Sequence, residues 1–210
     1  MRVRPISPGA LVEELSESLA GRSPGEWLRV AVDGAEAAAP GELADALVGP
    51  LRARGRAVVR VSARDFLRPA SLRYEFGRES PDAFYDDWLD AGGVLREVLA
   101  PLDPGGSGKV LPSLWDADRD RATRARYVDV PPGAVLLMDG PLLLGRWLPF
   151  DMAVHLSLSA AALARRTPGP RAWTLPAYER YEREAGPREA ADVVVKMDDP
   201  RHPALIEDAG

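Results

Sequence analysis

The stretch VAVDGAEAAAPGELADAL, residues 30–47, has the layout of a loop that could hold a phosphate group. An apolar run ends at Asp33 and Gly34, a loop of small residues follows, and a helical pattern of leucines then begins. Such a turn directs backbone N–H groups and the positive end of a helix toward an anion. A plain strand–turn–helix with Pro40 near the first helical position accounts for the same residues. The pattern alone leaves both interpretations open.

Two further groups that could do chemistry also follow apolar runs. Asp139 comes directly after residues 134–138 (AVLLM), and Asp65 comes shortly after residues 57–62 (AVVRVS). Ligands of open α/β sheets bind at the carboxyl ends of the strands. We therefore expect Gly34, Asp65 and Asp139 to lie at one edge of a sheet.

The elements that must position these residues alternate between strand and helix patterns. This alternation predicts an α/β fold with a mostly parallel sheet of about five strands. Apolar runs of strand length cover residues 28–33, 57–62, 134–138, 151–158 and 192–195. Helical patterns start at Ser7-Pro8 and at Ser80-Pro81, the second running to Leu99, and cover residues 42–53, 159–166 and 175–185. Pro50 is expected to end or kink the helix over residues 42–53.

Composition limits the class of protein. The chain of 210 residues is 46% hydrophobic and 28% charged, which predicts a single domain over residues 1–210. A net charge of −5 gives no basis for nucleic-acid binding. The chain has no cysteine, and its histidines, His155 and His202, lack ligand spacing, so no metal site is predicted. The absence of a long apolar stretch predicts a cytoplasmic protein with no membrane partner.

The chain from about residue 10 to 205 resembles the uridine kinase-like family of P-loop phosphotransferases. The resemblance is carried, in the family's order, by the stretches VAVDG, RDFLRP, RYEFGRESPDAFYDDWLD, LDPGGSG, PPGAVLLMDGPLLL, ALARR and EAADVVV. It implies a P-loop NTPase-like fold with helices on both faces of the sheet and a short lid. It also implies that the strands ending near Asp33 and Asp139 lie side by side.

The phosphate loop departs from the family pattern G-x-x-x-x-G-K-[ST]. Counted from Gly34, the second glycine is Ala39, the lysine is Pro40 and the Mg²⁺-binding hydroxyl residue is Gly41. Proline supplies neither a charge nor a backbone N–H. We therefore expect residues 34–41 not to wrap a triphosphate, although N–H groups at Gly34 and Gly41 could contact a smaller anion. No cofactor is predicted, and ATP and Mg²⁺ enter only if the chain is an active kinase.

The position of the catalytic base also differs. In the family an aspartate two residues before the aromatic accepts the proton of the substrate hydroxyl, and the position two residues before Phe66 is Arg64. Asp65 remains as a candidate base, but neighbouring side chains of an extended segment point to opposite faces. Arg64 is expected to pair with an acid, for which Asp65, Glu79 and Asp139 are the candidates.

The resemblance implies ligand contacts at other matching positions. These are Asp139 at the metal or its waters; Glu79 at the ribose, with Arg73 and Tyr74 beside it; Trp115 and Asp116 facing the base; and Arg165, Arg166 and Arg171 in a lid. An acceptor cleft bounded by Phe66, Arg73, Tyr74, Glu79 and Trp115 is expected to be better kept than the ATP site. Structural roles, such as a favourable helix-start charge for Glu79, stay open beside these functional ones.

These departures favour a pseudokinase or a repurposed protein that binds a nucleoside-like ligand or a small anion. Loss of one electrostatic stabiliser costs about 10²–10³ in rate, and loss of a general base costs about 10²–10⁴. The alternative is an active ATP-dependent kinase of uridine, cytidine or another small molecule, with its cation relocated to Arg64 or to a lid arginine. Whether the chain is an enzyme, and whether it forms a homo-oligomer, stays open at this point.

Overall fold

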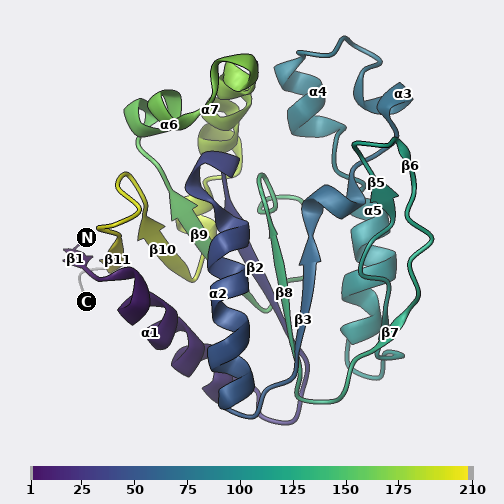
Figure 1. Ribbon diagram of the computed structural model, residues 1–210, viewed down its shortest axis with the longest axis vertical. Coiled ribbons are helices and arrows are strands. Elements are labelled where there is room, and N and C mark those ends of the chain that lie inside the picture. The colour runs from purple at the N-terminus through teal and green to yellow at the C-terminus, as the bar shows by residue number, and fades with distance from the viewer. Residues whose placement is uncertain (1, 208–210) are drawn as a thin grey trace.

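A seven-stranded sheet forms the centre of the computed structural model, which describes residues 2–207 (Figure 1). Its strand order is β1-β11-β10-β9-β2-β8-β3. The five parallel strands are β10 (Val193–Lys196), β9 (Met152–Ser157), β2 (Leu28–Gly34), β8 (Val135–Gly140) and β3 (Val58–Ser62). The antiparallel strands β11 (Ala204–Glu207) and β1 (Arg2–Pro5) extend one edge. The predicted α/β fold with a mostly parallel sheet is confirmed.

Helices cover both faces of this sheet, as expected. The helices are α1 (Pro8–Gly21), α2 (Pro40–Ala53), α3 (Ala70–Arg73), α4 (Pro81–Asp86), α5 (Ala91–Val94), α6 (Ala160–Arg166), α7 (Leu175–Glu184) and α8 (Pro187–Ala190). Neighbouring strand residues point to opposite faces, so Val30 and Val32 pack with the leucines of α1 and α2, whereas Ala31 belongs to the other core. That second core contains residues of α4, α5 and α7. In Figure 1, α1 and α2 lie across the front of the sheet.

The strands that carry the phosphate-loop residues and Asp139 are neighbours, as predicted. β2 and β8 are parallel, with Val32 opposite Asp139 and Asp33 opposite Gly140. Every residue of both strands is buried. This burial on both faces explains their continuous apolar sequences.

Three details differ from the sequence predictions. The edge strands β1 and β11 were not predicted, because they are short and β1 is mostly exposed. The predicted helix from Ser80 to Leu99 is broken: α4 ends at Asp86, Leu89 pairs with Leu67, and α5 starts anew with Asp90 as its cap. A π-helical turn, η3 (Leu95–Leu99), follows α5. Helix α2 continues through Pro50 to Ala53.

Short hairpins connect the broken helix to β8. They contain β4 (Lys109–Val110), β5 (Trp115–Asp116), β6 (Arg121–Ala122) and β7 (Val128–Asp129), with β4 paired to β7 and β5 paired to β6.

None of the helices in residues 2–207 is long and apolar enough to cross a lipid bilayer.

Candidate functional site

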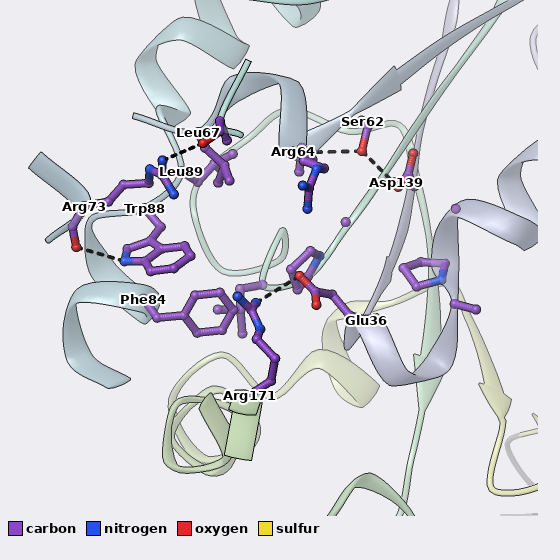
Figure 2. Close-up of a pocket in the computed structure, with 18 of the residues that line it drawn as sticks. Glu36, Ser62, Arg64, Leu67, Arg73, Phe84, Trp88, Leu89, Asp139 and Arg171 are labelled. Carbon is purple, nitrogen blue, oxygen red and sulfur yellow. Dashed lines mark hydrogen bonds and ion pairs between the residues drawn. The ribbon is translucent and has the colours of Figure 1, made fainter. Parts of the chain in front are cut away.

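A cavity of about 490 Å³ opens at the carboxyl ends of β3 and β8 (Figure 2). One end is formed by the phosphate-loop segment, which we define as residues 34–41, together with the start of α2. The other end is formed by the region of α3 and α4 and by Arg171 of the lid segment, defined as residues 165–174. The cavity therefore lies where ligands of open α/β sheets bind.

The phosphate-loop segment has a defined backbone path. Gly34 ends β2, and a Cβ atom at this position would lie 2.9 Å from the Cβ of Leu156, so only glycine fits. A 3₁₀ turn, η1 (Glu36–Ala38), follows, and Ala39 then takes a left-handed conformation with φ 56° and ψ 53°. A left-handed alanine costs about 1–2 kcal/mol. The loop thus keeps a left-handed residue where the family pattern has glycine, and Pro40 begins α2.

Asp139 is held by two neighbours on β3. The Arg60 Nη2 atom lies 2.8 Å from one carboxylate oxygen, and the Ser62 hydroxyl donates to the other at 3.2 Å. The Asp139 residue is 8% exposed. A Cβ at Gly41 would lie 3.3 Å from the Asp139 Oδ2 atom, so the carboxylate packs directly against this glycine. The negative charge of Asp139 is therefore neutralised within the protein.

The lid segment is tied to the phosphate-loop segment by an ion pair. The Arg171 Nη2 atom lies 3.1 Å from Glu36 Oε1, and Figure 2 shows this contact beside the ring of Phe84. The Arg171 guanidinium carbon also lies 5.8 Å from the ring centre of Trp88 and 5.6 Å from that of Trp173. Charge and cation–π attraction together hold the arginine at this place.

An aromatic cluster of Tyr74, Phe84, Trp88, Trp173 and Tyr178 supports the end of the cavity near α4. Its rings meet mainly edge to face, with the Phe84 and Trp88 centres 5.2 Å apart. The Trp88 indole N–H donates to the Arg73 carbonyl at 3.1 Å. These contacts fix Trp88 in one orientation.

Two arginines next to this cluster differ in their partners. Arg73 is 3% exposed, donates to the carbonyls of Arg68 and Ala117 at 2.7 and 3.2 Å, and has an acidic partner, Asp120, 3.8 Å from its Nη2 atom. Arg146 donates from Nε to the Leu142 carbonyl at 2.6 Å and from Nη2 to the Tyr85 carbonyl. Burial lowers the pKa of Arg146, and none of residues 2–207 forms an ion pair with it.

Arg64 forms an ion pair, but the prediction of its partner was wrong, because none of Asp65, Glu79 and Asp139 takes part in the pair. Its Nη2 atom lies 2.6 and 2.8 Å from the two carboxylate oxygens of Asp118, which sits in the turn between β5 and β6. This hydrogen bond is the main reason that the pKa of Arg64 is raised. Both side chains are largely exposed.

The structure brings together only part of the predicted site. The predicted residues that line the cavity are Gly41, Arg64, Arg73, Tyr74, Asp139 and Arg171. The predicted residues that lie outside its lining are Gly34, Asp65, Phe66, Glu79, Trp115, Asp116, Arg165 and Arg166.

Local contacts account for most of the residues that lie outside. Phe66 is fully buried in the core, and Trp115 donates its indole N–H to Asp120 at 3.1 Å. Asp116 accepts from the Asp118 N–H within the β5–β6 turn, which keeps its carboxylate in the hairpin. Gly34, the last residue of β2, packs against Leu156 of β9.

The other predicted residues outside the cavity lining are partly buried, have partners elsewhere in the protein or are exposed to solvent. Burial raises the pKa of Asp65, and this carboxylate lies outside the cavity lining. Glu79 is exposed just before the Ser80 cap of α4. Arg166 donates to the Met197 carbonyl at 2.5 Å, and Arg165 is exposed on α6.

Some cavity residues escaped the sequence analysis. Phe84 and Trp88 fall within the predicted helix from Ser80 to Leu99 and were not named as site residues, and neither were Glu36 and Arg146. A signal existed for Arg60, because a charge in the strand sequence VVRVS needs a partner. No sequence signal indicated that its partners are Asp139 and, at 2.9 Å from Nε, Asp45.

A buried pair lies beneath the phosphate-loop segment. The Asp33 carboxylate lies 2.6 Å from His155 Nδ1 and accepts from the Leu143 N–H at 2.9 Å. The His155 Nε2 atom is buried and has no hydrogen-bond partner among the described residues. Neither residue lines the cavity.

Comparison with known proteins identifies the fold. No protein-family model matches the chain, and no curated protein matches it. A solved structure of a proposed uridine kinase from Bacillus stearothermophilus matches with a TM-score of 0.71 and 22% identity, over 87% of this chain and 96% of that one. A proposed fructose transport system kinase from a Silicibacter species matches with a TM-score of 0.60 and 25% identity, over 89% and 95%.

A third structure, of the YGR205w protein, matches with a TM-score of 0.56 and 10% identity, over 96% of this chain and 100% of that one. The chain therefore has the fold of a P-loop kinase. Two of these three structural neighbours are described as kinases, one of them as a possible uridine kinase, in agreement with the sequence resemblance.

Proposed function

We propose that this protein binds a small ligand on a uridine kinase-like fold without transferring phosphate from ATP. The observation that carries the proposal is the Arg60–Asp139 pair, which has a nitrogen–oxygen distance of 2.8 Å. Asp139 matches the family's acidic residue near the metal. Here a guanidinium supplies the positive charge that a metal ion would bring to this carboxylate.

The residues around Asp139 do not fit Mg²⁺. Magnesium takes oxygen ligands in near-ideal octahedral geometry and keeps several of its waters. The Asp139 oxygens already accept from Arg60 and Ser62, and Gly41 has no hydroxyl to offer. A divalent cation would also meet the positive charge of Arg60. The described residues contain no group of three or more His, Cys, Asp or Glu placed to hold a metal ion.

The phosphate-loop segment does not fit a triphosphate either. Phosphate cradles combine backbone N–H groups with a lysine that reaches the outer phosphates. At the lysine position stands Pro40, which has neither charge nor N–H, and Glu36 adds a negative charge to the loop. Arg171, which could have served as a lid cation, is paired with Glu36.

The cavity itself supports a binding function. Its volume of about 490 Å³ falls within the range of small-molecule sites. Aromatic side chains and arginines line the end near α4, which suits a nucleoside-like ligand or a small anion. The active-kinase alternative needs a relocated cation, and Arg64 would first have to leave Asp118.

Titration calorimetry with Mg-ATP tests the proposal. We expect no binding tighter than about 1 mM, a binding free energy of about −4 kcal/mol. A coupled assay with uridine and cytidine as acceptors should show no ATP-dependent phosphorylation. A micromolar dissociation constant for Mg-ATP, or ordinary kinase turnover by the natural chain, would refute the proposal.

A repaired chain provides the matched comparison. The changes Ala39→Gly, Pro40→Lys, Gly41→Thr and Arg64→Asp restore the family pattern, and we would make them with and without Arg60→Val. Removing Arg60 frees Asp139 for a metal, so Mg-ATP binding should increase most in the version that carries Arg60→Val. Equal Mg-ATP binding by both versions would show that the Arg60–Asp139 pair does not exclude the metal.

A further inference from the structure

The cavity has an uneven distribution of charge. The acids Glu36, Glu42 and Asp139 line the end at the phosphate-loop segment. Toward the aromatic cluster the lining contains the arginines Arg73, Arg146 and Arg171, and Figure 2 shows Arg73 and Arg171 on different sides of Trp88. This arrangement is the reverse of a site that holds the phosphates of ATP at its loop end, where positive charge is needed.

Among the described arginines that line the cavity, Arg146 is the one without an ion pair, since Arg73 lies 3.8 Å from an oxygen of Asp120. Arg64 pairs with Asp118, and Arg171 pairs with Glu36. Arg146 donates to two backbone carbonyls, and no carboxylate of the described chain lies within ion-pair distance of it. Neither of these hydrogen bonds uses the Nη1 atom, and no described residue accepts a hydrogen bond from it. A partly buried guanidinium with open donors is suited to an oxyanion.

The Arg171–Glu36 pair can be exchanged for a ligand. Glu36 is 57% exposed, and ion pairs at exposed carboxylates contribute little to stability. Arg171 also keeps its contacts with the Trp88 and Trp173 rings without Glu36. An oxyanion in the cavity would therefore compete with Glu36 for the Arg171 guanidinium.

We propose that the cavity binds a small ring compound through one oxyanion, a phosphate monoester or a carboxylate, which Arg146 holds and which competes with Glu36 for the Arg171 guanidinium. This inference rests on the proposed binding function and names the class of ligand. The neighbouring Tyr74, Phe84 and Trp88 side chains contact the ring. The loop end, with Glu36 and Glu42, faces the uncharged part of the ligand.

Calorimetry with matched pairs of probes tests this proposal. UMP is compared with uridine, and orotate is compared with uracil, so each pair differs by one oxyanion. At least one anionic probe should bind about tenfold or more tightly than its neutral partner, as expected for charge-assisted hydrogen bonds. The two pairs distinguish a phosphate ligand from a carboxylate ligand.

Two variants should change the affinity in opposite directions. Arg146→Gln should lower the affinity for the anionic probe about tenfold or more and leave the affinity for the neutral probe unchanged. Arg146→Lys should retain part of the affinity for the anionic probe. Glu36→Gln should strengthen the anionic probe severalfold, because Arg171 is then released. Arg183→Gln, on the exposed side of α7, is the control and should change neither affinity.

The outcomes separate this inference from the proposed function. Equal affinity for charged and neutral probes, or no binding of UMP and orotate at millimolar concentration, would overturn the inference. The inference would also be overturned if folded Arg146→Gln bound the anionic probe as tightly as the parent does. If Arg146→Gln does not fold, Glu36→Gln decides the question: an affinity for the anionic probe no higher than that of the parent would overturn the inference. ATP-dependent turnover of uridine would refute the proposed function and leave the oxyanion preference standing.

Discussion

The two ends of the cavity differ in what defines them, which is the path of the backbone at one end and buried side chains at the other. The phosphate-loop segment keeps a backbone path, including the left-handed Ala39 and the helix start at Pro40, while its charged groups are satisfied by other residues of the protein. The end near α4 is built from buried side chains, among them Trp88 at 6% exposed and Arg73 at 3%. Loop shape is set by the packing of β2 and α2, so it persists when the chemistry of the loop changes. The lining side chains, rather than the path of the loop, therefore indicate which ligands the cavity can bind.

The largest expected effect is at Trp88. Trp88→Ala removes a buried ring that contacts Tyr74, Phe84 and Trp173 and should cost about 3–5 kcal/mol of stability. The midpoint of thermal unfolding, measured by calorimetry, should fall by about 10 °C. Trp147→Ala is the control, because Trp147 is 97% exposed and its loss should cost less than about 0.5 kcal/mol. Similar losses in both variants would mean that the Trp88 ring is not packed in the aromatic cluster.

The next largest loss of stability is expected for a change at Asp33, beneath the phosphate-loop segment. Asp33→Asn keeps the size of the side chain but removes the charge that bonds with His155 and the Leu143 N–H. Urea denaturation should show a loss of about 1–3 kcal/mol. Asp129→Asn, at an exposed position of β7, serves as the control and should be nearly neutral. A neutral result for Asp33→Asn would mean that strand-end contacts do not hold the loop in place.

A smaller effect of opposite sign is expected within the loop. Ala39→Gly removes the cost of a left-handed alanine and should stabilise the protein by about 0.5–1 kcal/mol. Ala37→Gly, in the neighbouring 3₁₀ turn, should instead destabilise it by a similar amount. Urea unfolding of the two variants measures the difference. Destabilisation in both would indicate that Ala39 is not strained in solution.

The smallest effect concerns pH. Burial raises the pKa of Asp65 above its ordinary value of 3.8, so the folded protein favours the protonated form. The stabilisation from this group is complete below pH 3.8 and is lost as pH rises through the raised pKa. Asp65→Asn does not titrate, so its stability relative to the parent should be greater at about pH 7 than at about pH 3. Denaturation of both proteins across this range tests it; a constant difference would mean that the pKa is not raised.

The sequence predicted the scaffold better than the site. Strands 28–33 and 134–138 were predictable because continuous apolar runs of this length, placed between helical patterns, are typical of buried parallel strands. The break after α4 was missed, because the helical spacing of Phe84, Trp88 and Leu95 continues across it. That spacing says nothing about the Leu67–Leu89 pairing that ends the helix.

The site was less predictable because its contacts join distant segments. Arg64 was expected to meet an acid, but Asp118 is 54 residues away, in a turn whose position no local pattern reveals. Arg60 and Asp139 are separated by 79 residues and meet only because β3 and β8 are neighbours. Residue types predicted that such charges need partners, and only the topology identified the partners.

The Arg60–Asp139 pair also affects how this protein could change by single substitutions. Gain of a lysine or a hydroxyl in the loop would have no metal to act on while the Arg60 guanidinium stays bound to Asp139. Loss of Arg60 alone would leave a nearly buried carboxylate without its counter-charge, which lowers stability. Each first step toward magnesium binding is therefore neutral or harmful, and only the combination is useful. Under the proposed function, restoring the loop lysine alone would not enable phosphoryl transfer, because the Arg60 guanidinium would still be bound to Asp139.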